Sequence, residues 1–395
     1  MPERILSETI LLPELKLTGY SRHQLHLFLG ARKKARYGLE VCPKCATPST
    51  TGYDKRTVKV KDAPLRNRAV TLVLTKRRFF CKTCKKPFTE PVAGIRFGRR
   101  TTERYRKQLL WACENFTDLK RVKRTFRCSS GFLYQALYEQ LELARRKRLY
   151  PWPKVIGVDE HSFLRKQNYG RTEFASIICD YDNKRVFELV RGKTTAELSA
   201  ALFHIKDRVN VESVIIDLCD PFRNFAREFF PQAHIVADKF HVLRLLNPAI
   251  NRRRKAIVGD RRTHLIGRLL LRNSLRLDYF TRETIWQWLE QHPDLKEIYY
   301  YKEALFRFYR TRGYRKASDA LTAMTDKMAT SRVPEIKTLR KTLMKWREPI
   351  LAYFFTGLTN GRTEGYNNLA KLIQRRAFGY KSFENYRLRL LNACA

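Results

Sequence analysis

The chain has 395 residues, with 80 lysines and arginines against 38 aspartates and glutamates, which gives a formal net charge of +42 at pH 7. The apolar fraction of 44% excludes a wholly disordered chain and is sufficient for a sizeable core. So much positive charge favours a polyanionic partner. Nucleic acid is favoured over an anionic membrane surface, because neutralised phosphates release counterions.

The expected compartment follows from what the sequence lacks. No apolar run of about 18 residues occurs, and the opening residues show no basic segment followed by an apolar one, as an export signal requires. Among the nine cysteines, two CxxC pairs stand out and the others are scattered, unlike a secreted disulfide framework. We therefore expect a cytoplasmic protein without a membrane partner.

Two CxxC pairs define the first domain, which we place at residues 39–95, after an N-terminal segment at residues 1–38. The thiols are those of Cys42, Cys45, Cys81 and Cys84. Each pair can aim two thiolates at one metal, and together they supply the four soft ligands of a tetrahedral Zn²⁺. Strand-like runs at 57–61 and 70–80 lie between the pairs and predict a zinc ribbon. No histidine lies within this stretch, so the predicted site is closed and structural; two unrelated redox or structural pairs are the alternative.

Residues 99–148 have the periodicity of three helices, which predicts a helix-turn-helix DNA-binding domain. The helices are expected to begin at polar residues, Thr101 or Thr102, Thr117, and Ser129 or Ser130. The first turn of the third helix would present Ser130, Tyr134 and Gln135 to the bases. Phosphate contacts, which position without specifying, would come from Arg121, Lys123, Arg124 and Arg127. Generic packing of three helices produces the same pattern and remains the alternative.

Residues 152–240 change to a mixed α/β pattern and form the first part of a predicted catalytic core. Apolar strands are expected at 155–158, 174–179, 186–190, 214–216 and 235–237, with helices after the third, fourth and fifth. This is the order of the ribonuclease-H-like fold, in which the first strand is central and the fourth lies beside it. Asp159 ends the first strand and Asp217 ends the fourth, so we expect the two carboxylates to meet at one edge of the sheet.

Residues 241–357 show helical stripes without strand alternation, which predicts a large helical insertion. The cluster Arg252, Arg253 and Arg254 indicates a DNA-facing surface on this insertion. Residues 358–395 would return to the core with a second helical part.

A third carboxylate is expected at Glu364, in the first turn of a helix in this last part. In two-metal phosphoryl transfer, a pair of ions about 3.5–4 Å apart activates the attacking oxygen and stabilises the leaving one. Magnesium prefers carboxylate oxygens, and two aspartates alone rarely suffice to hold such a pair. The same helix carries polar residues that suit phosphate contacts, Arg362, Asn367, Asn368, Lys371 and Arg375.

Other acidic residues compete for these roles. Asp220 follows the fourth strand closely but can cap the helix that begins at Pro221. Asp238 ends the fifth strand and is a rival to Asp217 for the second position. Strand alternation would point Glu160 to the face opposite Asp159. Glu364 itself suits the N-terminal end of a helix dipole without any catalytic role.

The sequence resembles the ISL-three family of bacterial insertion-sequence transposases over nearly its whole length. The resemblance is carried by CPKC and CKTC, and then by VIGVDEHSF, VIIDLCDPF, IVADKFHV and NGRTEGYNNLAKLIQRRAFGY, in that order. It implies that Asp159, Asp217 and Glu364 are the two aspartates and the glutamate of a DDE triad. No departure from that triad is visible.

The resemblance also implies an activity. We expect a DNA transposase that binds the terminal inverted repeats of its element, cleaves a strand and joins the freed end to target DNA, using Mg²⁺ or Mn²⁺. Paired ends imply a homodimer or a larger assembly on double-stranded DNA. Two rivals are kept, a catalytically inactive DNA-binding regulator and a ribonuclease-H-like nuclease or resolvase.

Overall fold

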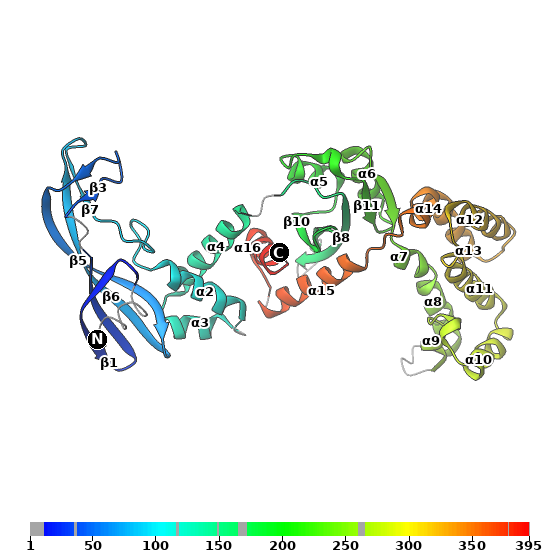
Figure 1. Ribbon diagram of the computed structural model, residues 1–395. Coiled ribbons are helices and arrows are strands. Elements are labelled where there is room, and N and C mark those ends of the chain that lie inside the picture. The colour runs from blue at the N-terminus through cyan, green and yellow to red at the C-terminus, as the bar shows by residue number, and fades with distance from the viewer. Residues whose placement is uncertain are drawn as a thin grey trace. The chain divides into compact units, whose positions relative to one another are not determined.

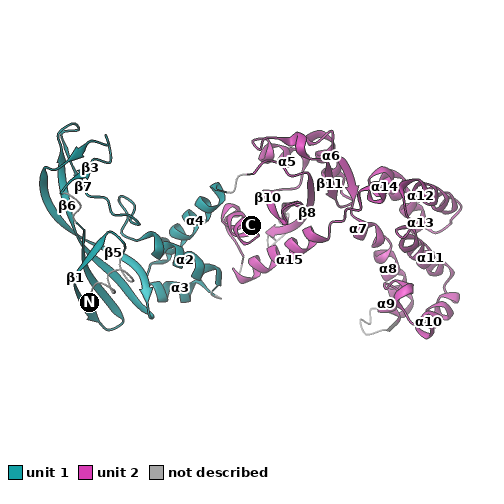
Figure 2. Cartoon of the chain, viewed as in Figure 1, with its two compact units in different colours: residues 1–148 teal, residues 149–395 magenta. Residues whose placement is uncertain are grey.

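The computed structural model describes residues 12–34, 38–115, 118–147, 150–164, 172–259, 265–377 and 379–394. The chain divides into two compact units, residues 1–148 and 149–395, which Figure 1 and Figure 2 show. Within the described ranges, no helix has the length and apolar character needed to cross a membrane.

The first unit is built on a mixed five-stranded sheet in the order β1-β2-β6-β5, with β7 also paired to β6. Its strands are β1 (Leu15–His23), β2 (His26–Lys33), β5 (Gly52–Leu65), β6 (Arg68–Cys81) and β7 (Lys86–Thr89). Alternate residues Val70, Leu72 and Leu74 of β6 are buried, as period-2 patterning requires. The strands expected at 57–61 and 70–80 lie within β5 and β6. Strand β2 runs parallel to β6, so the segment before residue 39 shares the sheet of the cysteine-bearing hairpin.

Three helices follow in the first unit, α2 (Glu103–Asn115), α3 (Leu119–Phe126) and α4 (Ser130–Arg146). Thr102, Asp118 and Ser129 satisfy the free amides at their starts, accepting bonds of 3.1, 2.7 and 3.2 Å from the backbone. The expected cap Thr117 lies outside the described residues, and Asp118 caps α3. The buried faces meet around Tyr105, whose hydroxyl donates to the Phe126 carbonyl at 3.0 Å.

The second unit contains a five-stranded sheet in the order β10-β9-β8-β11-β12. Its strands are β8 (Val155–Leu164), β9 (Glu173–Asp180), β10 (Arg185–Arg191), β11 (Ser213–Ile216) and β12 (His234–Ala237). Strands β8, β9 and β10 are antiparallel neighbours, whereas β11 is parallel to both β8 and β12. Asp159 therefore lies inside β8 and not at its end, because β8 continues past β11 as the partner of β9.

Helices cover both faces of this sheet. On one face, α5 (Thr195–Leu202) and α6 (Asp220–Phe229) bury Val158 and Ile216 in the largest core. The opposite face is covered by α14 (Arg347–Thr356), α15 (Gly361–Arg376) and α16 (Phe383–Ala393). The two faces alternate along each strand, since Ile215 and Val236 point toward α14 while their neighbours point the other way.

Between β12 and α15, the described residues form helices and their connections, without a strand. The helices of this insertion are α7 (Lys239–Leu243), α8 (Asn247–Val258), α9 (Leu265–Leu269), α10 (Tyr279–Glu290), α11 (Pro293–Phe308), α12 (Tyr314–Ala329) and α13 (Pro334–Lys345), followed by α14. Lys302 of α11 is fully buried and donates to the carbonyls of Leu270 and Arg272 at 2.8 and 2.6 Å. It thereby satisfies carbonyls just after α9 and pairs with Glu303 at 2.6 Å.

Gly157 of β8 allows α15 to approach the sheet closely. A Cβ at this position would lie 2.5 Å from Oγ1 of Thr363 and 2.8 Å from Oδ1 of Asn360, both at the start of the helix. These contacts are too short for any side chain, so only glycine permits this packing.

Gly157→Ala should therefore push α15 away from the sheet and lower the free energy of unfolding by about 1–3 kcal/mol through overpacking. Gly365→Ala is the matched control, because Gly365 lies in the same helix with no atom within 4 Å of a Cβ. The control should be neutral, or stabilising by up to about 1 kcal/mol. Chemical denaturation of both variants measures the difference, and equal midpoints would contradict the close packing.

Candidate catalytic and metal-binding sites

The four cysteines of the first unit come together as one group. Their Sγ atoms all lie within 4.8 Å of one another, and those of Cys45 and Cys81 are 3.5 Å apart. Cys42 and Cys45 lie on a turn closed by the Ala46 amide on the Cys42 carbonyl at 2.9 Å. Cys81 ends β6, and its Sγ accepts the Cys84 amide at 3.4 Å. Two turns thus present four sulfur ligands to one point, which fits a structural zinc.

The thiols are too crowded for all four to be thiolates without a cation. Hydrogen bonding with Thr47 lowers the pKa of Cys45 to about 6. The pKa of Cys84 shifts in the opposite direction, because the hydrogen bond to Cys45 raises it to about 12. A divalent ion would allow all four to deprotonate, which is the form that binds zinc.

In the second unit, strand register brings three aspartates to one level of the sheet. Ile216 of β11 pairs with Val158 of β8 on one side and with Ala237 of β12 on the other. The residues that directly follow Val158, Ile216 and Ala237 are Asp159, Asp217 and Asp238, respectively. Asp217 and Asp238 directly follow β11 and β12, and Asp159 lies within β8 where its parallel pairing with β11 ends, the region in which α/β proteins commonly bind ligands.

Asp159 is held by an asparagine of α15. The Asn367 amide group donates to Oδ2 of Asp159, and Oδ1 of Asn367 lies 3.0 Å from Nδ1 of His161. His161 is buried, and its Nε2 lies 2.7 Å from the Tyr386 hydroxyl of α16. A chain of buried polar contacts therefore fixes Asn367 and, through it, Asp159.

Asp217 and Asp238 share a second asparagine. Nδ2 of Asn360 donates to Oδ1 of Asp217 at 3.3 Å, and the Asn360 backbone amide donates to Oδ1 of Asp238 at 2.9 Å. Asp238 also caps α7, because its Oδ2 accepts the His241 amide at 3.3 Å. Nε2 of His241 lies 3.1 Å from Oδ2 of Asp217. Ligand atoms of Asp217, Asp238 and His241 all lie within 4.8 Å of one another, a grouping suited to a divalent ion.

The aspartates repel each other when ionised. Burial, followed by the charge of Asp159, the hydrogen bond to it and the charge of Asp238, raises the pKa of Asp217 to about 9. In the absence of a cation, one carboxyl of the group therefore keeps its proton at neutral pH. A bound divalent ion would reverse this preference by supplying the missing positive charge.

Glu364 lies in the first turn of α15 and is exposed. Unlike the three aspartates, it is not grouped with the other carboxylates. The compact group of described ligand atoms around Asp217 contains Asp238 and His241. Even so, Glu364 is four residues after Asn360 and three before Asn367, so all three lie on one face of the helix. The two asparagines contact the carboxylates of Asp217 and Asp159, and the glutamate occupies the stretch of helix between them.

Two rival acids have other partners. Asp220 pairs with Lys345 at 2.5 Å, and this hydrogen bond lowers the pKa of Asp220. It lies at the start of α6, where Cys219 occupies the cap position without a side-chain bond. Glu160 pairs with Lys193 at 3.5 Å, consistent with alternation along β8. Neither carboxylate belongs to the group around Asp217.

The residues expected to bind DNA differ in their exposure to solvent. In the first unit, the chosen residues are all exposed, namely Arg121, Lys123, Arg124, Arg127, Ser130, Tyr134 and Gln135. In the insertion, Arg252 is exposed but Arg254 is buried and donates to the Gly259 carbonyl at 3.3 Å. Arg253 pairs with Glu335 at 2.9 Å. The expectation of a three-arginine DNA surface is thus corrected at Arg254, which is buried against the end of its own helix, whereas the partly exposed Arg253 joins α8 to α13.

On α15, the side chains of Asn368, Lys371 and Arg375 are exposed. The predicted phosphate role of Asn367 is corrected, because this side chain is buried and bonded to Asp159. Arg362 is exposed but donates to the Tyr181 carbonyl and lies over the Tyr181 ring, 5.6 Å from its centre.

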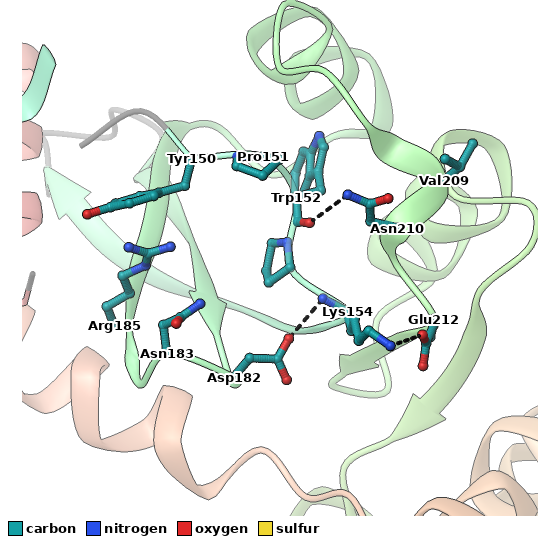
Figure 3. Close-up of a pocket in the computed structure, with 11 residues that line it drawn as sticks. Tyr150, Pro151, Trp152, Lys154, Asp182, Asn183, Arg185, Val209, Asn210 and Glu212 are labelled. Atoms are coloured by element: carbon teal, nitrogen blue, oxygen red, sulfur yellow. Dashed lines mark hydrogen bonds and ion pairs between the residues drawn. The ribbon is translucent and has the colours of Figure 1, made fainter. Parts of the chain in front are cut away.

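The described cavity of about 870 Å³ in Figure 3 is separate from the carboxylates. It is lined by Lys154 and Glu212, which pair at 2.9 Å and precede β8 and β11. It therefore lies at the amino ends of the parallel strands, whereas the aspartates follow their carboxyl ends. Arg185 stacks over Tyr150 at its rim, 3.5 Å from the ring centre.

Sequence reasoning missed the roles of several residues that shape the carboxylate site. Asn360 and Asn367 contact all three aspartates, Gly157 admits their helix, and His241 contacts Asp217. Two asparagines seven residues apart on one helix face were the available signal, because this spacing spans two turns.

Cys81→Ser should lower the zinc content from one ion per chain to nearly none and destabilise the first unit, because three thiolates and a hydroxyl form a poor zinc site. Native mass spectrometry measures the zinc content. Cys219→Ser is the control, since Cys219 lies in the second unit, and it should keep its zinc. Retention of a full zinc complement by Cys81→Ser would contradict the four-cysteine site.

Asp217→Asn should stabilise the protein in the absence of added divalent cations, increasingly so as pH rises. Asp217 has a folded-state pKa of about 9, above its ordinary 3.8. Its contribution to stability is therefore complete below the ordinary pKa and is lost as pH rises toward 9, whereas asparagine does not titrate. Thermal melting between pH 5 and pH 9 measures this. Parallel pH profiles for the two proteins would contradict the repulsion, and added Mg²⁺ should raise the melting temperature of the wild type only.

Comparison with known proteins agrees with this geometry. A family profile described as a transposase of the ISL3 (ISL-three) DDE type matches residues 156–390, and one described as the zinc finger of transposases IS204, IS1001, IS1096 and IS1165 matches residues 39–84. The transposase for insertion sequence element IS1001 from Bordetella parapertussis is 24% identical over 364 residues, which is 89% of this chain and 87% of that protein. Because the transposase profile spans more than half of the sequence, the chain belongs to the ISL-three family of insertion-sequence transposases.

Proposed function

We propose that this transposase binds the terminal inverted repeats of its element and catalyses DNA strand cleavage and strand transfer at Asp159, Asp217 and Glu364. The observation that carries the proposal is the strand register, which makes Asp159 and Asp217 neighbours at the point where the pairing of β8 with β11 ends. Crowded, partly buried carboxylates are costly for stability, and their retention in one group is typical of a site that binds cations.

The sheet order supports a ribonuclease-H-like core. Three antiparallel strands precede two parallel ones, and β8 lies at the centre of the order β10-β9-β8-β11-β12. That is the arrangement in which the first and fourth strands of the fold carry the first two catalytic aspartates.

Glu364 is proposed as the third carboxylate because of its place on α15. The flanking residues Asn360 and Asn367 contact Asp217 and Asp159, so this face of the helix is turned toward the site. Glu364 is exposed, so its carboxylate is free to turn toward a cation when DNA is bound. Asp159, Asp217 and Glu364 would together hold the divalent ions.

The reaction is proposed as two successive in-line displacements at phosphorus, without a covalent protein intermediate. Water first breaks the P–O3′ bond at the element end, leaving a 3′-hydroxyl on the element. That hydroxyl then attacks a target phosphate, forms a new P–O3′ bond and displaces the 3′-hydroxyl of the target strand. Bound divalent ions would activate the attacking oxygen and neutralise charge on the leaving oxygen. The protein positions both DNA strands and supplies little proton chemistry.

End recognition is proposed for the first unit. Helices α2, α3 and α4 have the short-helix and long-helix order of a helix-turn-helix, and α4 begins with exposed Ser130, Tyr134 and Gln135. Lys61 of β5 donates to the Arg127 carbonyl at 2.8 Å, at the turn between α3 and α4. Sheet and helices of this unit would therefore bind DNA together. Two element ends must be joined in one reaction, so we expect a dimer or larger assembly on DNA.

Single substitutions Asp159→Ala, Asp217→Ala and Glu364→Ala should each reduce strand cleavage and strand transfer by at least about 100-fold, because loss of mere supporting residues around metals already costs 10–100-fold. Binding to inverted-repeat DNA should remain, since it resides in the first unit. Gel assays with labelled element ends and Mg²⁺ or Mn²⁺ measure all three steps.

Asp220→Ala is the matched control, because it removes a nearby carboxylate that pairs with Lys345 instead. This variant should keep cleavage and joining. Cleavage without joined products in the wild type would favour a nuclease, and binding without either product would favour a regulator. Activity of Glu364→Ala near the wild-type rate would overturn the assignment of the third carboxylate.

A further inference from the structure

His241 lies beside the carboxylates, although the proposed triad of Asp159, Asp217 and Glu364 does not require a histidine. Its Nε2 lies 3.1 Å from Oδ2 of Asp217, and ligand atoms of Asp217, Asp238 and His241 lie within 4.8 Å of one another. The group combines two carboxylate oxygens with one imidazole nitrogen. Such a mixed ligand set differs from the all-oxygen set of a carboxylate triad.

The backbone holds His241 close to the ends of β11 and β12. Asp238 caps α7, and its Oδ2 accepts the backbone amide of His241 at 3.3 Å. The histidine therefore lies in the first turn of α7, directly after β12, and its ring reaches back to the end of β11. Its side chain is 48% exposed, compared with 12% for Asp217. An ion arriving from solvent can thus reach the imidazole and the buried carboxylate together.

His161, on the other side of the aspartates, has a different role. It is 4% exposed, and both ring nitrogens are occupied, Nδ1 by Asn367 at 3.0 Å and Nε2 by Tyr386 at 2.7 Å. It could bind an ion only by releasing those partners. His161 is therefore a positioning residue, whereas His241 offers a nitrogen at the carboxylates themselves.

We propose that Asp217, Asp238 and His241 together bind one divalent cation, with two carboxylates and the His241 nitrogen as its ligands. This proposal rests on the proposed function, and it adds Asp238 and His241 to the triad. A nitrogen ligand selects for a transition ion such as Mn²⁺ over Mg²⁺, which prefers oxygen ligands and gives up its water reluctantly. The site should therefore bind Mn²⁺ more tightly than Mg²⁺.

The test uses the full chain with its zinc bound and adds Mn²⁺ alone, without DNA. Pulsed electron paramagnetic resonance detects an imidazole nitrogen bonded to Mn²⁺ by its hyperfine modulation, and calorimetry gives the Mn²⁺ and Mg²⁺ affinities. The wild type should show the nitrogen signal. His241→Ala should lose it and bind Mn²⁺ at least about tenfold more weakly, with a smaller change for Mg²⁺.

Two further variants control for structural effects. His204→Ala removes an exposed histidine outside the group and should keep the signal and the affinity. Asp238→Asn keeps a good helix-capping residue, so α7 should persist, but it replaces a charged ligand and should weaken Mn²⁺ binding. Circular dichroism checks that each variant stays folded.

Three outcomes would overturn the proposal. The first is a wild type that binds Mn²⁺ through Asp217, as judged with Asp217→Asn, but without nitrogen modulation. The second is a His241→Ala variant that keeps the modulation, and the third is unchanged Mn²⁺ affinity in both His241→Ala and Asp238→Asn. Joined DNA products without the nitrogen signal would refute this site alone. A nitrogen-bound ion without cleavage or joining would refute the proposed function alone.

Discussion

The second unit depends on holding several carboxylates close together against their mutual repulsion. Parallel register aligns Asp159, Asp217 and Asp238, and the sheet does this with backbone hydrogen bonds that do not involve the charges. The cost appears in the raised pKa of Asp217, caused mainly by burial and then by Asp159. A fold that keeps such a group must either carry a cation there or keep a proton. The clustering of carboxylates and the conformational stability of the unit are therefore opposed at these strands.

Amide side chains moderate that conflict without adding charge. Asn360 and Asn367 each donate to an aspartate from opposite ends of the first two turns of α15. An arginine or lysine would neutralise the carboxylates more strongly, but it would also compete with a divalent ion for the same oxygens. Neutral donors orient the carboxylates and leave room for a cation. Gly157 completes this arrangement by admitting the helix that bears them.

Local chemistry was predictable from the sequence, and long-range pairing was not. The cysteine pairs, the cap Ser129, the five core strands and the helical character of the insertion follow from spacing and periodicity, which are properties of short segments. The pairing of β2 with β6 depends on residues about forty positions apart, and no local pattern specifies it. Likewise, Arg253 looked free for DNA because its partner Glu335 belongs to another helix.

The candidate site shows the same division. Asp159 and Asp217 could be chosen because each follows an apolar strand run, although β8 continues beyond Asp159 for a reason that only its pairing with β9 explains. The contacts of Asn367, His161 and Tyr386 join segments about two hundred residues apart. Composition and periodicity do not predict such contacts, because asparagine, histidine and tyrosine are also common on solvent-facing helices.

The helical insertion begins and ends within the carboxylate group. It starts after Asp238 and returns at Asn360, whose backbone amide donates to that same aspartate at 2.9 Å. The two stems of the insertion are thus joined by this bond and by the hydrogen bond of 3.2 Å from Lys239 of α7 to the Tyr353 hydroxyl of α14. The insertion also shares the largest hydrophobic core with Val158 and Ile216 of the sheet, so the helices and the strands that carry the aspartates form one packed body.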